Sequence, residues 1–209
     1  ALTPDRSPKQ GIEPVYITPV PTLINYRATN GLYFSLSDHF RSSTGTQAFR
    51  NAFGYVFQEY VGTLLRQAFG DENVIAEWKY ANKKEQKDTP DWIVICNGRA
   101  VLIEVKQSGL YLPAKKWANE KDIQKDLKRT IGKGAFQMWK FISDLDSGVC
   151  EPPEPLRGTE IVEKLVVTFD RSYFVNSIIR DEIRRLYPAL PTYYDWHTIA
   201  IEELVYVLD

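Results

Sequence analysis

Two apolar runs that flank Asn97-Gly98 constrain the fold more than any other part of this sequence. The first run is Asp91–Cys96 and the second is Ala100–Lys106. Asn-Gly between apolar runs is a strong signal for a two-residue hairpin turn, so we expect two antiparallel strands. Asp91 is six residues before Asn97 and Glu104 is six residues after Gly98. Pairing about the turn should therefore bring Asp91 opposite the 104–106 end of the second strand.

The sequence segments before and after this hairpin have the periodicity of amphipathic helices. A long amphipathic helix is expected from Thr46 to Phe69, ended by Gly70, and a second one over Lys121–Leu145. The residues expected to be buried on the first helix are Phe49, Ala52, Phe53, Val56, Phe57, Tyr60, Val61, Leu64, Leu65 and Ala68. The remaining expected elements are strands over Gly31–Leu36, Val74–Tyr80, Ile161–Phe169 and Trp196–Ile201, and a helix over Tyr173–Tyr187. This order predicts an α/β fold with a central mixed sheet flanked by helices, because the second long helix allows a parallel crossover.

The first 40 residues are rich in proline and predict an extended lead-in, with the folded domain expected over residues 41–209. A 44% hydrophobic and 13% aromatic content excludes a chain that is disordered throughout. No apolar run approaches the ~18–20 residues of a membrane helix, and no secretory leader is visible. The two cysteines do not form a disulfide framework. We therefore expect a cytoplasmic protein, which could be a domain of a larger one.

Charge is unevenly distributed along the chain. The formal net charge is −1, but Lys79 to Lys140 hold fourteen Lys and Arg against seven Asp and Glu, a local +7. The second long helix carries a basic flank, which consists of Lys121, Lys125, Lys128, Arg129 and Lys133. Such a flank can follow a phosphate backbone, or it can be a solvated helix face. The sequence leaves both interpretations open.

Asp91, Glu104 and Lys106 combine groups that can act on a phosphate ester. Glu104 and Lys106 are two residues apart on a strand, so they share a face at a separation of about 6–7 Å. Neighbouring carboxylates repel each other unless a cation lies between them, and hard oxygen ligands favour Mg²⁺ or Mn²⁺. A lysine beside such an ion can orient or deprotonate water, or stabilise developing charge. The simpler alternative is a surface ion pair, which contributes only ~0.2–1 kcal/mol.

Pro90-Asp91, followed by Glu104-Val105-Lys106 at the end of an apolar strand, resembles the PD-(D/E)XK (restriction-endonuclease-like) nuclease superfamily. The resemblance extends to that family's αβββαβ core over roughly residues 46–170. It implies metal-dependent hydrolysis of phosphodiester bonds, with Asp91 and Glu104 binding Mg²⁺ or Mn²⁺ and Lys106 assisting the attacking water. It also implies nucleic acid as partner, DNA rather than RNA, and by analogy a role in restriction, repair or anti-phage defence.

One feature departs from the family pattern. The family commonly has a glutamate on its first helix, in a pattern such as Gly-x-x-Phe-Glu, whereas here Gly54-Tyr55-Val56-Phe57 is followed by Gln58 and then Glu59. Glu59 is the candidate catalytic carboxylate if the helix is rotated, and the Gln58 carbonyl is a weaker alternative. Gln137, on the second long helix, is a weak candidate for the family's polar helix residue and for nucleic-acid binding with Lys125, Lys128, Arg129 and Lys133. The departure keeps a second hypothesis open, namely an inactive nuclease-fold module for binding nucleic acid or protein within a larger assembly.

Other chemistries have little support in the sequence. The two histidines, His39 and His197, are far apart and lack metal-ligand spacing. Two distant cysteines exclude a zinc ribbon, and Gly132-Lys133-Gly134 lacks the spacing of a phosphate loop. Tyr111 and Trp117 could stack on bases. Oligomeric state is not determined by the sequence, so a homodimer remains open.

Overall fold

The computed structural model describes residues 3–4, 16–17, 30–40, 46–80, 86–107, 120–170 and 176–209, arranged as two compact units. The first unit covers residues 1–52 and the second covers residues 53–209. Tyr111 and Trp117 lie outside the described residues, so their expected stacking role stays a prediction. The boundary expected between residues 40 and 41 also stays a prediction.

The first unit contains two short paired strands and a helix. Strands β1 (Thr3–Pro4) and β2 (Tyr16–Ile17) pair antiparallel, and α2 spans Asn30–His39. The strand expected over residues 31–36 is therefore wrong. Tyr33 of α2 packs on Phe49 of the next helix, with ring centroids 5.9 Å apart. The apolar side chains of this segment are therefore packed by aromatic contacts and not by pairing with another strand.

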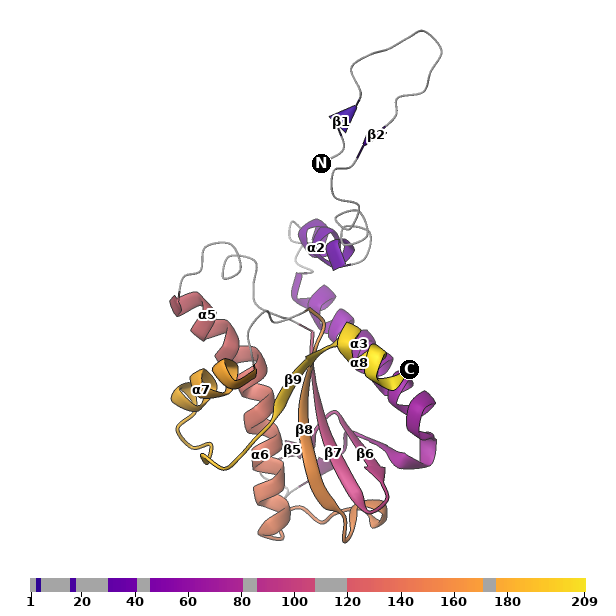
Figure 1. The fold of residues 1–209 in the computed structure, drawn as a ribbon, viewed down its shortest axis with the longest axis vertical. Helices are drawn as coiled ribbons and strands as arrows, with labels where there is room; N and C mark the ends of the chain where they lie inside the picture. The colour runs from indigo at the N-terminus through magenta and orange to yellow at the C-terminus, as the bar shows by residue number, and fades with distance from the viewer. Residues whose placement is uncertain are drawn as a thin grey trace. The chain divides into compact units, whose positions relative to one another are not determined.

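The second unit is built on a five-stranded mixed sheet with the order β3-β6-β7-β8-β9 (Figure 1). Its strands are β3 (Val74–Ala76), β6 (Trp92–Cys96), β7 (Arg99–Lys106), β8 (Glu160–Thr168) and β9 (His197–Ala200). The pairs β3–β6 and β6–β7 are antiparallel, whereas β7–β8 and β8–β9 are parallel. The expected mixed sheet with a parallel crossover is confirmed.

The central hairpin has the predicted turn and register. Asn97 and Gly98 both have positive φ, 51° and 72°, as a primed two-residue turn requires. The register pairs Cys96 with Arg99 beside the turn and Trp92 with Ile103 farther along. The strand predicted over residues 74–80 is instead broken into β3 and β4 (Lys79–Tyr80), and β4 pairs with β5 (Lys87–Asp88).

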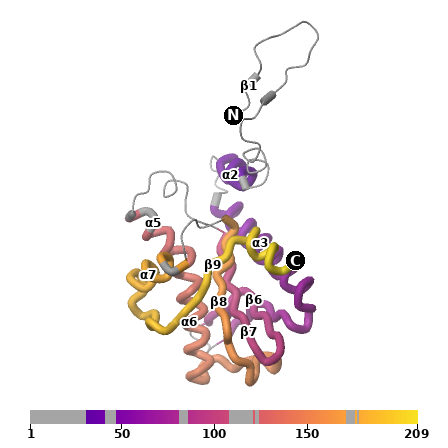
Figure 2. Tube along the Cα trace, in the orientation of Figure 1, coloured from indigo at the N-terminus to yellow at the C-terminus, as the bar shows by residue number. Residues whose placement is uncertain are grey.

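Helices cover both faces of the sheet in the second unit (Figures 1 and 2). One face packs on α5 (Glu120–Leu127), the π-helical segment η3 (Lys128–Gly132), α6 (Lys133–Asp146) and α7 (Asn176–Leu186). The other face packs on α3 (Thr46–Phe69) and α8 (Ile201–Leu208). Short 3-10 turns occupy Asp71–Asn73 and Glu154–Leu156. Among the described residues, no helix has both the length and the apolar character needed to cross a bilayer.

The buried side of α3 is narrower than its apolar pattern predicted. Phe57, Val61 and Leu65 are buried against the sheet. Val56 and Tyr60, which were expected in the core, are 66% and 48% exposed. A helix lying on a sheet contacts it along one line, so apolar residues at the margins of a wide stripe stay in solvent.

Candidate active site

Three carboxylates form a row across neighbouring strands at one end of the sheet. Extending the β3–β6 and β6–β7 registers by one residue aligns Glu77 with Asp91 and Asp91 with Glu104. The Glu77 backbone N–H donates to the Asp91 carbonyl oxygen over 3.0 Å, which continues the ladder beyond β3. Side chains alternate along strands, so the three share the face of Ile93 and Leu102, which pack in the core beneath α6. We call Glu77, Asp91 and Glu104 the carboxylate row.

Asp91 is held in place by the backbone of the partner strand. Its Oδ2 accepts a hydrogen bond of 2.6 Å from the Val105 N–H. Burial, followed by the negative charge of Glu104, raises the pKa of Asp91 from 3.8 to about 7, against the lowering effect of Lys106 and the Val105 hydrogen bond. The carboxyl therefore sits in an environment that favours its neutral form unless further positive charge is supplied.

Glu104 is almost completely buried, at 2% exposure, and pairs with Lys106. Lys106 Nζ lies 2.5 Å from Glu104 Oε1. Burial raises the pKa of Glu104, and the adjacent Lys106 ammonium opposes that rise. The second oxygen, Oε2, is buried and has no hydrogen-bond partner among the described residues. A buried acceptor without a donor costs about 1–3 kcal/mol, so this oxygen is suited to accept a further partner.

Helix α6 closes over this cluster at a glycine. A Cβ on Gly134 would lie 3.0 Å from Glu104 Cγ and 3.3 Å from Lys106 Cε, so the missing side chain allows the close approach. Gln137, one turn later, accepts a hydrogen bond from Lys106 Nζ over 3.3 Å through Oε1. Exposed Lys133 at the start of α6 is close enough for its charge to lower the pKa of Glu104. Asp91, Glu104, Lys106 and Gln137 are thus brought together.

The two candidate residues of α3 lie differently. Glu59 is exposed, and its backbone carbonyl accepts a hydrogen bond of 2.9 Å from Thr63 Oγ1. Gln58 is partly buried, and its side-chain amide lies close enough to the Glu77 carboxylate to lower the pKa of that group, against the larger raising effect of burial. The residue of this helix that lies near the carboxylate row is therefore Gln58 rather than the candidate carboxylate Glu59.

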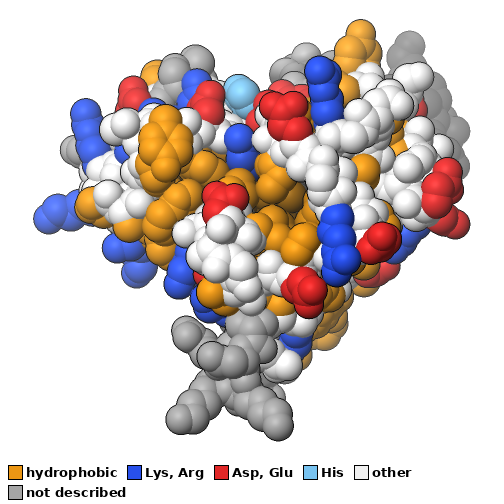
Figure 3. Space-filling view, turned by 90° about the horizontal axis from the view of Figure 1, so that it is seen from below, with side chains coloured by type: hydrophobic (Ala, Val, Ile, Leu, Met, Phe, Trp, Pro, Cys, Tyr) orange, Lys and Arg blue, Asp and Glu red, His pale blue; other side chains and the backbone are white. Residues whose placement is uncertain are grey.

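The basic residues proposed to bind nucleic acid are all on the surface. Lys125, Lys128, Arg129 and Lys133 are exposed on α5, η3 and the start of α6. Arg129 pairs with Asp126 at 3.6 Å, and the Lys128 ammonium lies 5.7 Å from the centre of the Tyr187 ring. On the face in Figure 3, basic, acidic and hydrophobic side chains are interspersed.

The atoms of the carboxylate row are suitable ligands for a small cation, but the three side chains do not converge on one point. Its donors are hard oxygens, negative charge is in excess, and Glu104 Oε2 lacks a partner. However, within the part of the chain that the structure describes, no group of three or more His, Cys, Asp or Glu side chains is gathered closely enough to hold a metal ion. Two carboxylate ligands therefore fit the structure better than three.

Sequence reasoning missed Glu77, Gly134 and Tyr194. Tyr194 is 5% exposed, donates to the Ala135 carbonyl over 3.1 Å, and has a pKa raised by burial and by the charge of Glu104. Glu77 directly follows the apolar segment Val74–Ala76, and a correct β3–β6 register would have placed it beside Asp91. No comparable signal marks Gly134, whose role depends on how closely α6 packs on the sheet.

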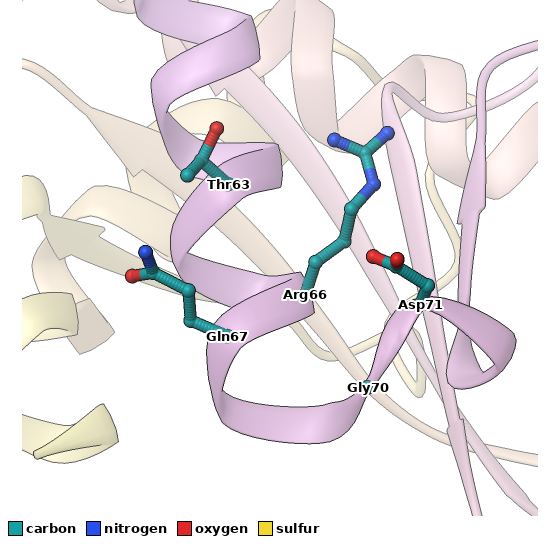
Figure 4. A pocket seen from close by; sticks show the side chains of 5 residues that line it. All are labelled: Thr63, Arg66, Gln67, Gly70 and Asp71. Atoms are coloured by element: carbon teal, nitrogen blue, oxygen red, sulfur yellow. The ribbon is translucent and has the colours of Figure 1, made fainter.

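A shallow pocket of about 430 Å³ lies elsewhere, at the C-terminal end of α3 (Figure 4). It is lined by Thr63, Arg66, Gln67, Gly70 and Asp71. None of these residues belongs to the carboxylate row. The Arg66 guanidinium lies 4.6 Å from the centre of the Trp92 ring, which indicates a packing role for that side chain.

The raised pKa of Asp91 predicts a pH-dependent stability for the metal-free protein. Between about pH 4 and pH 7 the folded state holds a proton on Asp91 that the unfolded state has released, so the free energy of unfolding falls as pH rises. Asp91→Asn should remove the part of this fall that Asp91 causes, leaving the dependence that Glu104 causes, and above pH 7 it should be more stable than wild type by about 2–4 kcal/mol. Urea melts in EDTA from pH 4 to pH 8 measure the difference. Parallel profiles for the two proteins would contradict the prediction.

No protein-family model matches this chain, and a search of curated proteins finds no similar sequence.

Proposed function

We propose that this chain is a metal-dependent nuclease of the PD-(D/E)XK type that hydrolyses phosphodiester bonds of nucleic acid. The observation that carries the proposal is the buried, unpartnered Oε2 of Glu104, which lies in a cluster with Asp91 and a lysine. An oxygen atom of this kind gains most from a cation, since burying an unsatisfied carboxylate oxygen is costly. The αβββαβ order of α3, β3, β6, β7, α5–α6 and β8 is compatible with that fold.

In this proposal Asp91 and Glu104 hold Mg²⁺ or Mn²⁺. When bound, such an ion polarises a phosphoryl oxygen and lowers the pKa of a water molecule. The Val105 N–H keeps one Asp91 oxygen fixed, so the other oxygen is the free ligand. Lys106 Nζ lies between Glu104 and Gln137, where it can hydrogen-bond the attacking water or the developing charge on phosphorus. Gln137 orients the ammonium without adding charge.

The substrate contacts proposed for this nuclease lie beside the same cluster. Lys133 is close enough to influence Glu104, so a phosphate held by Lys133 would lie near the reacting atoms. Lys125, Lys128 and Arg129 continue the exposed basic surface along η3 and α5. We favour DNA over RNA, and a role in restriction, repair or defence, on the family resemblance alone.

A second function is favoured by one specific observation. Gln58 stands where the family pattern has a helix carboxylate, and it lies close enough to Glu77 to affect the pKa of that carboxylate. Without a ligand from this helix the domain could bind nucleic acid or protein without turnover. This alternative predicts binding that does not depend on Mg²⁺, and divalent-dependent nicking would exclude it.

The proposed function is tested by incubating the purified chain with supercoiled plasmid and with single-stranded RNA, in Mg²⁺, Mn²⁺ or EDTA. We expect nicked and linear plasmid with Mg²⁺ or Mn²⁺ and intact plasmid in EDTA. Asp91→Asn should abolish the cleavage. Cleavage that persists in EDTA, or that is equally fast in Asp91→Asn, would contradict the metal-dependent mechanism.

A further inference from the structure

We propose that α7 is an edge cap, which occupies the outer edge of strand β9 and prevents the sheet from being extended by β9 of a second copy of this chain. This inference goes beyond the proposed nuclease activity and does not depend on it. Strand β9 is the last strand in the order β3-β6-β7-β8-β9, so within the described ranges one of its edges is not paired with another strand of the sheet. An open edge presents backbone N–H and C=O groups that readily pair with another chain.

Asn176, the first residue of α7, takes the place of a neighbouring strand at this edge. Its Oδ1 accepts a hydrogen bond of 2.8 Å from the Thr198 N–H, and its Nδ2 donates to the Thr198 carbonyl over 3.3 Å. A side-chain amide carries the same kinds of donor and acceptor as a peptide group. Asn176 therefore bonds both groups through which Thr198 could pair with an incoming strand.

Two arginines of α7 continue the contact along the same edge. Arg180 Nη1 donates to the Trp196 carbonyl over 3.4 Å, and Arg184 Nη2 donates to the Tyr194 carbonyl over 2.9 Å. The contacts from Asn176 onward thus step by four residues along the helix and by two residues along the extended chain. Four helical residues rise ~6 Å and two strand residues rise ~6.6 Å, so the spacing of the helix matches the spacing of the edge.

The N–H groups of the alternate residues on either side of Thr198 are bonded as well. Their hydrogen bonds run from Tyr194 to the Pro191 carbonyl (3.1 Å), from Trp196 to Asp195 Oδ1 (3.2 Å) and from Ala200 to Glu203 Oε2 (2.9 Å). Backbone groups of every second residue of a strand point to the same edge. An incoming strand would therefore have to displace existing hydrogen bonds at each of these positions.

The first test is hydrogen exchange of the Thr198 N–H, measured by NMR in wild type and in Asn176→Ala. Alanine removes the acceptor and leaves both arginines in place, so we expect exchange to become roughly 10-fold faster. The matched control is Arg185→Met, at an exposed position of α7 where the side chain pairs with Glu182 and not with the backbone of β9. It should exchange at the wild-type rate. Equal rates in wild type and Asn176→Ala would overturn the capping role of α7.

The second test is the mass of the chain in solution, measured by size-exclusion chromatography with light scattering. The triple variant Asn176→Ala/Arg180→Met/Arg184→Met loses all three contacts, and methionine retains the apolar stem of arginine. We expect its mean mass to rise toward twice the chain mass as concentration increases, with no such rise in wild type or Arg185→Met. Adding Thr198→Pro removes the N–H at the edge, where proline is tolerated, and should reverse the association.

Each result supports or overturns the edge cap. A folded triple variant that associates no more than wild type would overturn it. Association that persists after Thr198→Pro would also overturn it, because another surface would then be responsible. If circular dichroism shows that the triple variant does not fold, Asn176→Ala/Arg184→Met takes its place, since it retains the 2.6 Å ion pair between Arg180 and Asp195. Plasmid cleavage by wild type bears on the proposed function alone.

Discussion

Replacing Lys106 with alanine is expected to slow plasmid cleavage by roughly 10³-fold while leaving divalent-cation binding intact. The ammonium lies 2.5 Å from Glu104 Oε1 and 3.3 Å from Gln137 Oε1, and it is the basic group in direct contact with the proposed metal ligands. Removing the Lys106 ammonium eliminates a hydrogen-bond donor to the reacting atoms, but it removes none of the oxygen atoms proposed to bind the metal ion. Because a positive charge next to Glu104 disappears, Mn²⁺ should bind Lys106→Ala at least as tightly as wild type.

Two further variants separate the possible roles of Lys106. Lys106→Arg retains the charge but cannot serve as a base, so cleavage close to wild type would indicate charge stabilisation and a loss would indicate proton transfer. Lys140→Ala, on an exposed part of α6, is the matched control and should cleave at the wild-type rate. Metal-free Lys106→Ala should also melt lower than wild type, because Glu104 then has no buried counter-charge. Cleavage by Lys106→Ala at the wild-type rate would rule out the proposed mechanism.

Gly62→Ala is expected to destabilise the fold by about 2–3 kcal/mol, although alanine favours helices over glycine by about 1 kcal/mol. A Cβ at position 62 would lie 2.2 Å from the Trp92 ring. That ring cannot move aside cheaply, because Trp92 is 1% exposed and its Nε1 donates to the Gln58 carbonyl. Overpacking at this point should therefore shift α3 away from the sheet.

Gly54→Ala is the matched control on the same helix. A Cβ there would lie 3.4 Å from the side-chain amide of Gln107, which is an ordinary contact, so this variant should be unchanged or up to about 1 kcal/mol more stable. Urea unfolding followed by far-UV circular dichroism compares the two variants with wild type. Equal or greater stability of Gly62→Ala would contradict the predicted packing of α3 on Trp92.

The sequence predicted the position of Asp91 relative to Glu104, because a tight turn determines how their two strands pair. A two-residue Asn97-Gly98 turn leaves one register for the hairpin, so the alignment of Asp91 with Glu104 could be counted along the chain. Glu77 could not be found in the same way. Strands β3 and β6 are separated in the sequence by the paired strands β4 and β5. No short turn joins β3 to β6, so their register could not be counted along the chain.

Features that depend on tertiary contact were also beyond the sequence. Helical periodicity placed Val56 and Tyr60 in the core, but the line of contact with the sheet leaves both exposed. A short apolar run such as residues 31–36 fits a strand or a helix, and here it forms α2. The helix α8 was not expected, and it begins where the Glu203 carboxylate accepts a hydrogen bond of 2.9 Å from the Ala200 N–H.

Anomalous scattering from crystals soaked in Mn²⁺ is the most direct test of the carboxylate row as a metal site. We expect one strong peak within about 2.0–2.5 Å of an oxygen of Asp91 and of Glu104 Oε2. Lys106 Nζ should move off Glu104 toward the space where substrate binds. A Mn²⁺-saturated crystal with no peak at these oxygens, and with the Lys106–Glu104 ion pair unchanged, would contradict the metal-dependent nuclease.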